Sequence, residues 1–421
     1  MKRFKFTASL LILTLFFSIE LFSQNELYIR QVDSVMKTMS IRDKVAQLFI
    51  IEISRNPSNK TRVRQDSLIS EYGVGNVIIM RGSIHEFAQR MNHLQGLAKI
   101  PLMVATDGEW GAAMRFYEYL SYPRQAQLAR IEKGGEKLLY KMGLNVGKEL
   151  KDLNIMVNYA PVADVSSHEN PSDSQRSFSD DPSQVAILAD AYMRGMQDAG
   201  IYACGKHFPG HGGTTVDSHY EMPIIDKTVE YLDTVDLKPY YRMFANGLEM
   251  VMLGHFSIPS IEPSGIPMSI SSKCIDWLLK DKMGFKGVII TDAIPMKGLS
   301  KDLEPLEANL AVYKAGADML LMPVDVFNSI DAITDSVKNG VFSLDDLDRR
   351  VHKVLMLKAR AGYFNKGFSP YIVDLDKKIA KAKKRDRRLI KKMKKEMLKS
   401  RKPFIEPVGD DKTLLLDEAG K

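Results

Sequence analysis

Between residues 47 and 323, short apolar runs alternate with longer amphipathic stretches. Eight of these runs are rich in β-branched or large aliphatic residues, at 47–53, 75–80, 101–107, 155–164, 203–208, 250–255, 287–292 and 317–323. The segments between them have helical length and period, as at 183–200 and 271–285. Continuous apolar strands separated by helices indicate a parallel sheet that is buried on both faces. Eight such units over roughly 280 residues predict an α/β fold of the (β/α)8 TIM-barrel type, with an open doubly wound sheet as the alternative.

Most of the apolar runs end in a polar or charged residue. In a (β/α)8 barrel, catalytic residues lie at the C-terminal ends of the strands and in the loops that follow. Six side chains occupy such positions in the sequence: Asp107, Asp164, Lys206, His207, His255 and Asp292. A charge beside a strand end can instead cap the next helix, and for Asp164 we expect that role.

The N-terminus has the pattern of a secretory signal peptide. Three basic residues among the first five precede an apolar run at 8–19. A run of roughly 12–15 apolar residues is too short for a bilayer span and fits the core of a signal peptide. An uncleaved membrane anchor is the alternative, because the segment lacks a clean small-x-small cleavage pattern. We therefore expect a signal peptide at 1–23, a catalytic barrel at 24–370 and a periplasmic or secreted protein.

The net charge of +7 is concentrated near the C-terminus. Residues 377–402 have a local balance of +13 and the first 20 residues add +2, which leaves −8 on the remainder. A mildly acidic body argues against a nucleic-acid-binding core. Apolar residues recur at helical spacing from Asp374 to Ser400, so we expect 371–421 to be a basic tail built on one amphipathic helix. The basic face of this helix either stays solvated or makes weak contact with an anionic membrane or cell-wall polymer.

The densest cluster of reactive side chains is KHFPGHGGTTVDSH, residues 206–219. Asp217 lies two residues before His219, which lets both side chains project to the same side of an extended segment. The carboxylate can then orient the imidazole for general acid and base catalysis. Alternatively, His207, His211, Asp217 and His219 bind a divalent metal, or the histidines are structural. Spacing alone does not decide among these three interpretations.

Motifs outside this loop add a family resemblance. The loop follows NYAPVADV (158–165) and RSFSDDP (176–182), and it precedes LGHFSIPSIEPSGIPMSIS (253–271) and VIITDAIPM (288–296). Over about residues 33–358 the chain resembles glycoside hydrolase family 3, and within it the NagZ-type β-N-acetylglucosaminidases. The Lys-His-Phe-Pro-Gly-His-Gly motif with its following Asp-Ser-His separates this subgroup from the β-glucosidases of the family.

The resemblance implies a retaining exo-hydrolase that removes terminal GlcNAc from peptidoglycan-derived muropeptides or related oligosaccharides, without metal or organic cofactor. Asp292 would be the nucleophile that forms a covalent glycosyl-enzyme. His219, oriented by Asp217, would protonate the leaving oxygen and then activate water. The family's sugar-binding residues match five positions here, which are Asp107, Arg115, Arg176, Lys206 and His207.

Two other functions stay open when the residues are considered alone. One is a metal-dependent barrel hydrolase with His207, His211 and His219 as ligands, and the other is a non-catalytic cell-wall glycan-binding protein. The chain also departs from the family at DGEWG (107–111), where Trp110 replaces a glycine. Trp110 either packs against the protein or stacks on a sugar.

Overall fold

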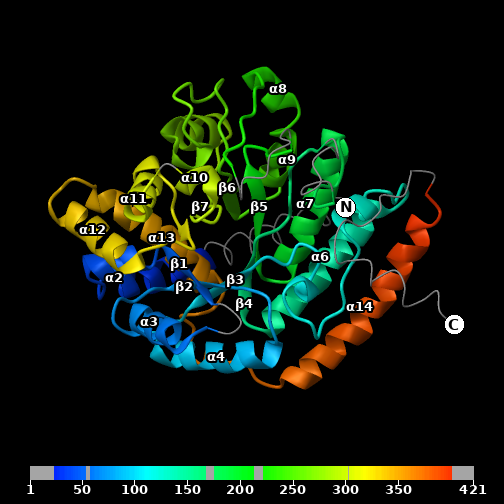
Figure 1. Ribbon diagram of the computed structural model, residues 1–421. Helices are drawn as coiled ribbons and strands as arrows, with labels where there is room; N and C mark the ends of the chain where they lie inside the picture. The colour runs from blue at the N-terminus through cyan, green and yellow to red at the C-terminus, as the bar shows by residue number, and fades with distance from the viewer. Residues whose placement is uncertain (1–22, 54–56, 167–174, 213–220, 302, 401–421) are drawn as a thin grey trace, which may run out of the picture.

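In the computed structural model, which describes residues 23–53, 57–166, 175–212, 221–301 and 303–400, eight parallel strands surround the core (Figure 1). They are β1 (Phe49–Ile53), β2 (Asn76–Ile79), β3 (Met103–Thr106), β4 (Ile155–Asn158), β5 (Tyr202–Phe208), β6 (Met250–Leu253), β7 (Val288–Thr291) and β8 (Leu320–Leu321). Seven of them lie within one of the eight apolar runs, and β5 begins one residue before the run at 203–208. Their hydrogen-bonded order is β7-β6-β5-β4-β3-β2-β1-β8.

The two ends of this strand order also meet. Ile290 in β7 forms a parallel bridge with Met319, next to β8. The amide of Met319 donates to the carbonyl oxygen of Ile289 over 3.0 Å. The sheet is therefore a closed (β/α)8 barrel, which confirms the predicted fold and excludes the open sheet.

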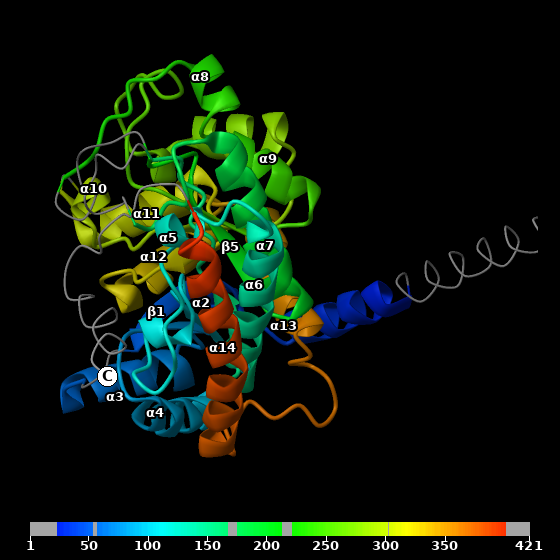
Figure 2. The same cartoon turned by 90° about the vertical axis from the view of Figure 1, so that its right-hand side faces the viewer.

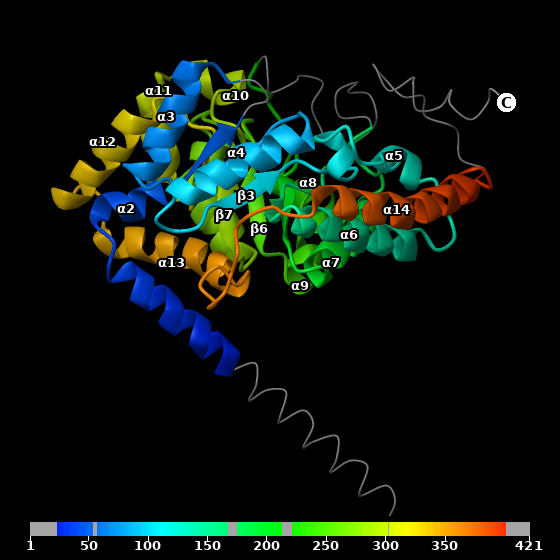
Figure 3. The same ribbon diagram turned by 90° about the horizontal axis from the view of Figure 1, so that it is seen from below.

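Helices cover the outside of the barrel, as Figure 3 shows from below. They are α2 (Ile41–Ala46), α3 (Asn59–Ser70), α4 (Ile84–Leu97), α5 (Gln125–Leu128), α6 (Gly135–Asp152), α7 (Pro182–Asp198), α8 (Val229–Thr234), α9 (Lys238–Ala245), η3 (Lys273–Lys282), α10 (Lys297–Ser300), α11 (Pro305–Ala315), α12 (Val326–Lys338), α13 (Leu344–Arg360) and α14 (Leu375–Met397). The helices expected at 183–200 and 271–285 are α7 and η3.

In helix α7, local sequence determines where the helix begins and how closely it packs against α6. The Asp181 side chain accepts from the amide of Ser183, and Pro182 occupies the first turn, where a missing N–H is tolerated. Further along the helix, Gly195 lies so close to α6 that a Cβ there would overlap the carbonyl oxygen of Tyr140. The two helices therefore touch through their backbones.

A buried lysine ties the last barrel helix to the first strands. Lys358 in α13 is fully buried. Its Nζ donates to Gln47 Oε1 over 2.8 Å and to the Gly75 carbonyl over 2.9 Å. Burial lowers the pKa of Lys358 to about 7. These bonds fasten the end of the barrel opposite the strand C-termini.

The helix expected from Asp374 to Ser400 is α14, which runs alongside α6 (Figure 2). It buries one face against the barrel and leaves most of its lysines and arginines exposed. The buried face consists of Ile379, Ala382, Asp386, Leu389, Ile390 and Met393. Within the described ranges, no helix has the length and apolarity needed to cross a membrane.

Candidate active site

Three strands deliver acidic and basic side chains to one end of the barrel. Asp107 follows β3 directly, Lys206 and His207 lie near the end of β5, and Asp292 follows β7. They line a cavity of about 580 Å³ together with side chains from the neighbouring loops. Its other polar lining residues are Glu109, Arg115, Arg176 and His211. All five predicted sugar-binding residues and the predicted nucleophile therefore reach the same cavity.

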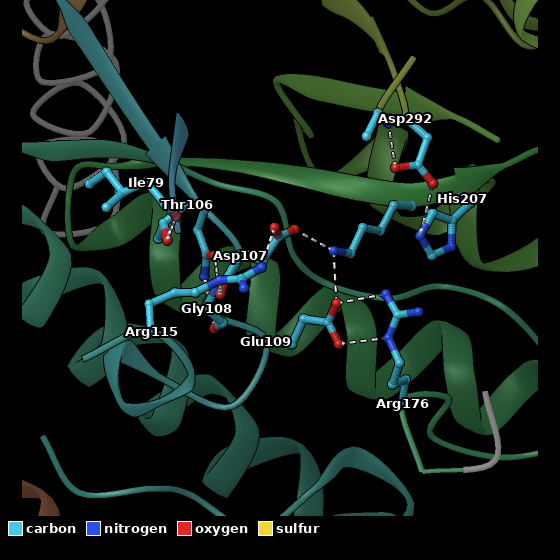
Figure 4. A network of polar contacts seen from close by, with 12 residues as sticks. Ile79, Thr106, Asp107, Gly108, Glu109, Arg115, Arg176, His207 and Asp292 are labelled. Atoms are coloured by element: carbon cyan, nitrogen blue, oxygen red, sulfur yellow. Dashed lines mark hydrogen bonds and ion pairs between the residues drawn. The ribbon is translucent and has the colours of Figure 1, made fainter. Parts of the chain in front are cut away.

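Lys206 is the centre of a charged network among the residues that line this cavity. Figure 4 labels its other members, Asp107, Glu109, Arg115 and Arg176. Its Nζ lies 2.8 Å from Asp107 Oδ1 and 2.8 Å from Glu109 Oε1. The other carboxylate oxygen of Asp107, Oδ2, lies 2.6 Å from Nη2 of Arg115. Glu109 accepts two hydrogen bonds from the guanidinium of Arg176, at 2.8 and 3.1 Å. We call these five residues the rim network.

The rim network keeps its acids ionised although they are buried. Burial alone would raise the pKa of both Asp107 and Glu109. For Asp107 the charges of Lys206 and Arg115 outweigh burial, and the pKa is lowered. For Glu109 the charges of Arg176 and Lys206 hold the pKa well below its usual range. Burial opposes the charge of Lys206, but the two carboxylates raise its pKa. The network is thus charged at neutral pH.

Asp292 faces this network from β7. Its Oδ1 accepts the amide of Ala293 over 2.7 Å, and its Oδ2 lies 3.7 Å from Nε2 of His207. Burial raises the pKa of Asp292, but His207, His255, the Ala293 amide and Lys206 together lower it. An ionised, accessible carboxylate oxygen beside donor groups is suited to nucleophilic attack.

His207 is oriented by Asp164, and the prediction that Asp164 caps a helix is wrong. Asp164 is buried next to β5, and its Oδ2 lies 2.8 Å from His207 Nδ1. Its Oδ1 accepts the amides of His207 and His211 over 3.1 and 2.8 Å. Burial is outweighed by these contacts, so the pKa of Asp164 falls to about 2. The ionised Asp164 carboxylate accepts a hydrogen bond from the Nδ1–H group of His207, and Nε2 is then directed toward Asp292.

His255, the sixth side chain expected at a strand end, lies behind Asp292. It is fully buried, with Nδ1 2.7 Å from Ser269 Oγ and Nε2 3.2 Å from the Ala293 carbonyl. It does not line the cavity. His255 therefore supports the segment that carries Asp292.

The predicted acid/base pair, Asp217 and His219, lies outside the described residues. In the part of the loop that is described, His211 lines the cavity and its ring centroid is 5.8 Å from that of His207. Among the described residues, which exclude this pair, no group of three or more His, Cys, Asp or Glu side chains has the arrangement of a metal site. The structure thus brings the predicted nucleophile and the predicted sugar-binding residues to one cavity. Their roles, like that of the dyad, stay predictions.

Glu109 was not predicted as a site residue. It lies two positions after Asp107 in DGEWG and is completely buried. Its position in a Gly-rich turn after a strand was a usable signal, because such a turn brings backbone and side chains close to a ligand. Trp110, next to it, does not line the cavity, and the Arg124 guanidinium lies 3.2 Å from its ring centroid. Trp110 thus stacks on a protein cation.

Comparisons with known proteins agree with this geometry. Residues 40–357 match the model of the glycosyl hydrolase family 3 N-terminal domain. The chain is 30% identical over 346 residues to beta-hexosaminidase A of Pseudoalteromonas piscicida, covering 73% of this chain but 58% of that protein. It is 32% identical over 257 residues to a beta-hexosaminidase of Nitrosospira multiformis, covering 59% of this chain and 73% of that one.

A solved structure is similar over most of the chain. It is a glycoside hydrolase family 3 beta-N-acetylglucosaminidase from Paenibacillus sp., with a TM-score of 0.75 and 29% identity. The match covers 86% of this chain and 69% of that structure. The mycobacterial protein titled M tuberculosis LpqI matches at a TM-score of 0.70 and 26% identity, over 78% of this chain and 96% of its own.

Proposed function

The chain belongs to glycoside hydrolase family 3, and on that premise we propose that it is a retaining exo-β-N-acetylglucosaminidase. The substrate would be a terminal GlcNAc of peptidoglycan-derived muropeptides or related oligosaccharides. One observation carries the proposal: the Asp292 carboxylate and the rim network line a single cavity of about 580 Å³. That volume suits a sugar-sized ligand, since small-molecule sites span roughly 300–1,000 Å³.

In the proposed reaction, Asp292 attacks the anomeric carbon. The bond from its oxygen to that carbon forms as the glycosidic C–O bond breaks, and the departing oxygen takes a proton from His219. Water then gives a proton back to His219 and attacks the glycosyl ester, which frees the sugar and Asp292. The lowered pKa of Asp292 keeps it ionised for the first step.

The rim network would hold the sugar. Carboxylate oxygens of Asp107 accept hydrogen bonds from sugar hydroxyls, whereas Lys206 and Arg176 donate to hydroxyl and carbonyl oxygens. Because each charge already has an opposite partner at 2.6 to 3.1 Å, the donors and acceptors are fixed in direction before the sugar enters. Such preorganisation lowers the entropic cost of binding.

Two further parts of the proposal come from the sequence. His219 with Asp217 would supply acid and base catalysis, without a metal or organic cofactor. Export to the periplasm or the medium rests on the basic and apolar pattern of residues 1–23.

Turnover of a chromogenic β-GlcNAc glycoside, compared with the matching β-glucoside, tests the proposal. Wild type should cleave the GlcNAc substrate with or without EDTA. A fluorinated GlcNAc analogue should form an adduct on the peptide that contains Asp292. Asp292→Ala should abolish both, whereas Asp335→Ala, which changes an exposed acid on α12, should leave both intact.

Loss of activity in EDTA with recovery in zinc would favour the metal-dependent hydrolase. Glycan binding without any turnover by wild type would favour the non-catalytic protein. Either result would overturn the proposal.

A further inference from the structure

Two buried acids lie where α14 packs against α6. Asp386 has no solvent exposure, although it lies in a helix whose neighbouring residues are mostly lysine and arginine. Glu149 in α6 is also completely buried. A helix that docked only through apolar contacts would not bury a carboxylate, because burying a charge is unfavourable unless it is paired and hydrogen-bonded.

Tyr122 connects Asp386 to the sugar-binding segment. The Tyr122 hydroxyl donates to Asp386 Oδ1 over 2.8 Å, and its backbone amide donates to the Trp110 carbonyl over 3.2 Å. The Tyr122 ring also packs against Gly111, where a Cβ would lie 3.1 Å from the ring. Gly111 has a φ of +101°, a conformation that strongly favours glycine. The tyrosine therefore contacts the turn that separates Glu109 from Arg115.

Glu149 reaches the same turn from α6. Its Oε2 accepts the amide of Ala112 over 3.0 Å. Its Oε1, taken as an ionised oxygen, has no hydrogen-bond donor, and the guanidinium of Arg385 lies 3.9 Å away. Burial and the nearby Asp386 carboxylate, to which Glu149 hydrogen-bonds, raise the pKa of Glu149 well above its usual range. A protonated Glu149 donates to Asp386 and still accepts from Ala112.

Asp386 is also paired with a cation, the neighbouring Arg385. Arg385 Nε donates to Asp386 Oδ1 over 3.0 Å, and Arg385 Nη2 donates to the Asn145 carbonyl over 3.0 Å. The Asn145 side chain in turn donates to the Tyr122 hydroxyl over 3.1 Å. Helix α14 is thus joined to α6 and to the turn by a connected set of hydrogen bonds.

We propose that Asp386, Tyr122 and Glu149 are positioning residues that hold the 107–115 segment. Through them, α14 would help to set the geometry of the active site. They do not touch the cavity. They fix the backbone that carries Asp107, Glu109 and Arg115, three members of the rim network. This inference rests on the proposed function, because its effect is read in sugar binding.

Asp386→Ala tests the inference in the full chain. It removes the acceptor of Tyr122 and of Glu149, and we expect kcat/KM on the GlcNAc substrate to fall by about tenfold to thirtyfold, as for the loss of charged buried hydrogen bonds. The loss should be largely a rise in KM, with weaker inhibition by free GlcNAc, since the rim network binds the sugar. Arg388→Ala, an exposed change on the same helix, should match wild type.

Substitutions at Glu149 separate positioning from simple stability. Glu149→Gln keeps an acceptor for Ala112 and a donor for Asp386, so KM should stay within about threefold of wild type. Glu149→Ala keeps neither and should resemble Asp386→Ala. If Asp386→Ala does not fold, Tyr122→Phe retains the ring against Gly111 and removes only the hydroxyl, with an expected rise in KM of about threefold to tenfold.

Hydrogen exchange gives a reading that does not need activity. The amide of Ala112 should exchange at least about tenfold faster in Glu149→Ala than in wild type or Glu149→Gln, because its acceptor is gone. Unchanged KM and unchanged exchange in folded Asp386→Ala and Glu149→Ala would overturn the inference. Absence of any wild-type turnover would instead overturn the proposed function. The exchange rate of the Ala112 amide would still show whether Glu149 holds this amide.

Discussion

Replacing Lys206 by methionine removes the charge at the centre of the rim network and keeps a side chain of similar length. Lys206 is almost fully buried and contacts Asp107 and Glu109 at 2.8 Å each. At an effective dielectric constant of about 20, each contact at that distance has an attraction of about 6 kcal/mol before desolvation. Desolvation of a buried ion offsets several kcal/mol of this attraction.

Each carboxylate keeps one cation when Lys206 is gone, since Arg115 still binds Asp107 and Arg176 still binds Glu109. We therefore expect Lys206→Met to lower the free energy of unfolding at pH 7 by about 3 kcal/mol, the lower end for breaking a buried pair. Urea unfolding followed by circular dichroism measures this difference. Lys280→Met is the matched control, because Lys280 binds Asp276 at the same 2.8 Å on the surface and should contribute less than about 1 kcal/mol.

The pH dependence distinguishes charge from packing. Asp107 and Glu109 have lowered pKa values in the folded protein, so their contribution is present above about pH 4–5 and is lost as pH falls through the folded values. Without Lys206 their folded pKa values rise toward those of the unfolded chain, so the variant loses less stability in acid. The difference between the proteins should stay nearly constant from pH 7 to about pH 4.5 and should narrow as pH falls further, through the pKa values of these carboxyls in the folded variant. A difference that stays constant down to about pH 3 would refute the electrostatic account of Lys206.

Three other changes have defined outcomes. His219→Ala should lower kcat on a substrate with a poor leaving group by about 10²-fold or more and on an acidic nitrophenyl leaving group by far less, and equal losses on both would exclude an acid role. Asp164→Asn should fold as the wild type does but lower kcat/KM by at least about tenfold, because His207 loses the charge that orients it. A pH–rate profile identical to that of the wild type would contradict this prediction. Gly195→Ala should destabilise the protein by about 1–3 kcal/mol in urea unfolding, because its Cβ meets the Tyr140 carbonyl, whereas equal stability would show that α6 and α7 can separate freely.

The fold was predictable because burial on both faces leaves a strong signal. All eight apolar runs contain strands, and the bridge from Ile290 to Met319 closes the sheet, as expected for eight such units. The position of α14 was not predictable. Its apolar spacing indicated a helix, but the contact with α6 also buries Asp386, which in sequence is one more charge in a charged segment.

The site was predictable where a residue directly follows a strand, as with Asp107 and Asp292. Asp164 was misjudged because the chain just after β4 pairs with β5, through the parallel bridge from Val162 to Lys206, and no local pattern reports that pairing. Glu109 was missed because its partners, Lys206 and Arg176, are about 70 to 100 residues away in the sequence. Long-range ion pairs of this kind become visible only when the strands are set side by side.

The rim network has a consequence for which glycans such a cavity can tell apart. Its three cations and two carboxylates pair at separations of 2.6 to 3.1 Å and leave a formal charge of +1, which the ionised Asp292 in the same cavity offsets. An uncharged sugar ring that enters displaces no counter-ions, so its affinity should depend little on ionic strength. A polyanionic glycan likewise gains no extra affinity at this position. Selectivity at the wall then depends on the angles at which hydroxyl and amide groups meet fixed partners, and on shape.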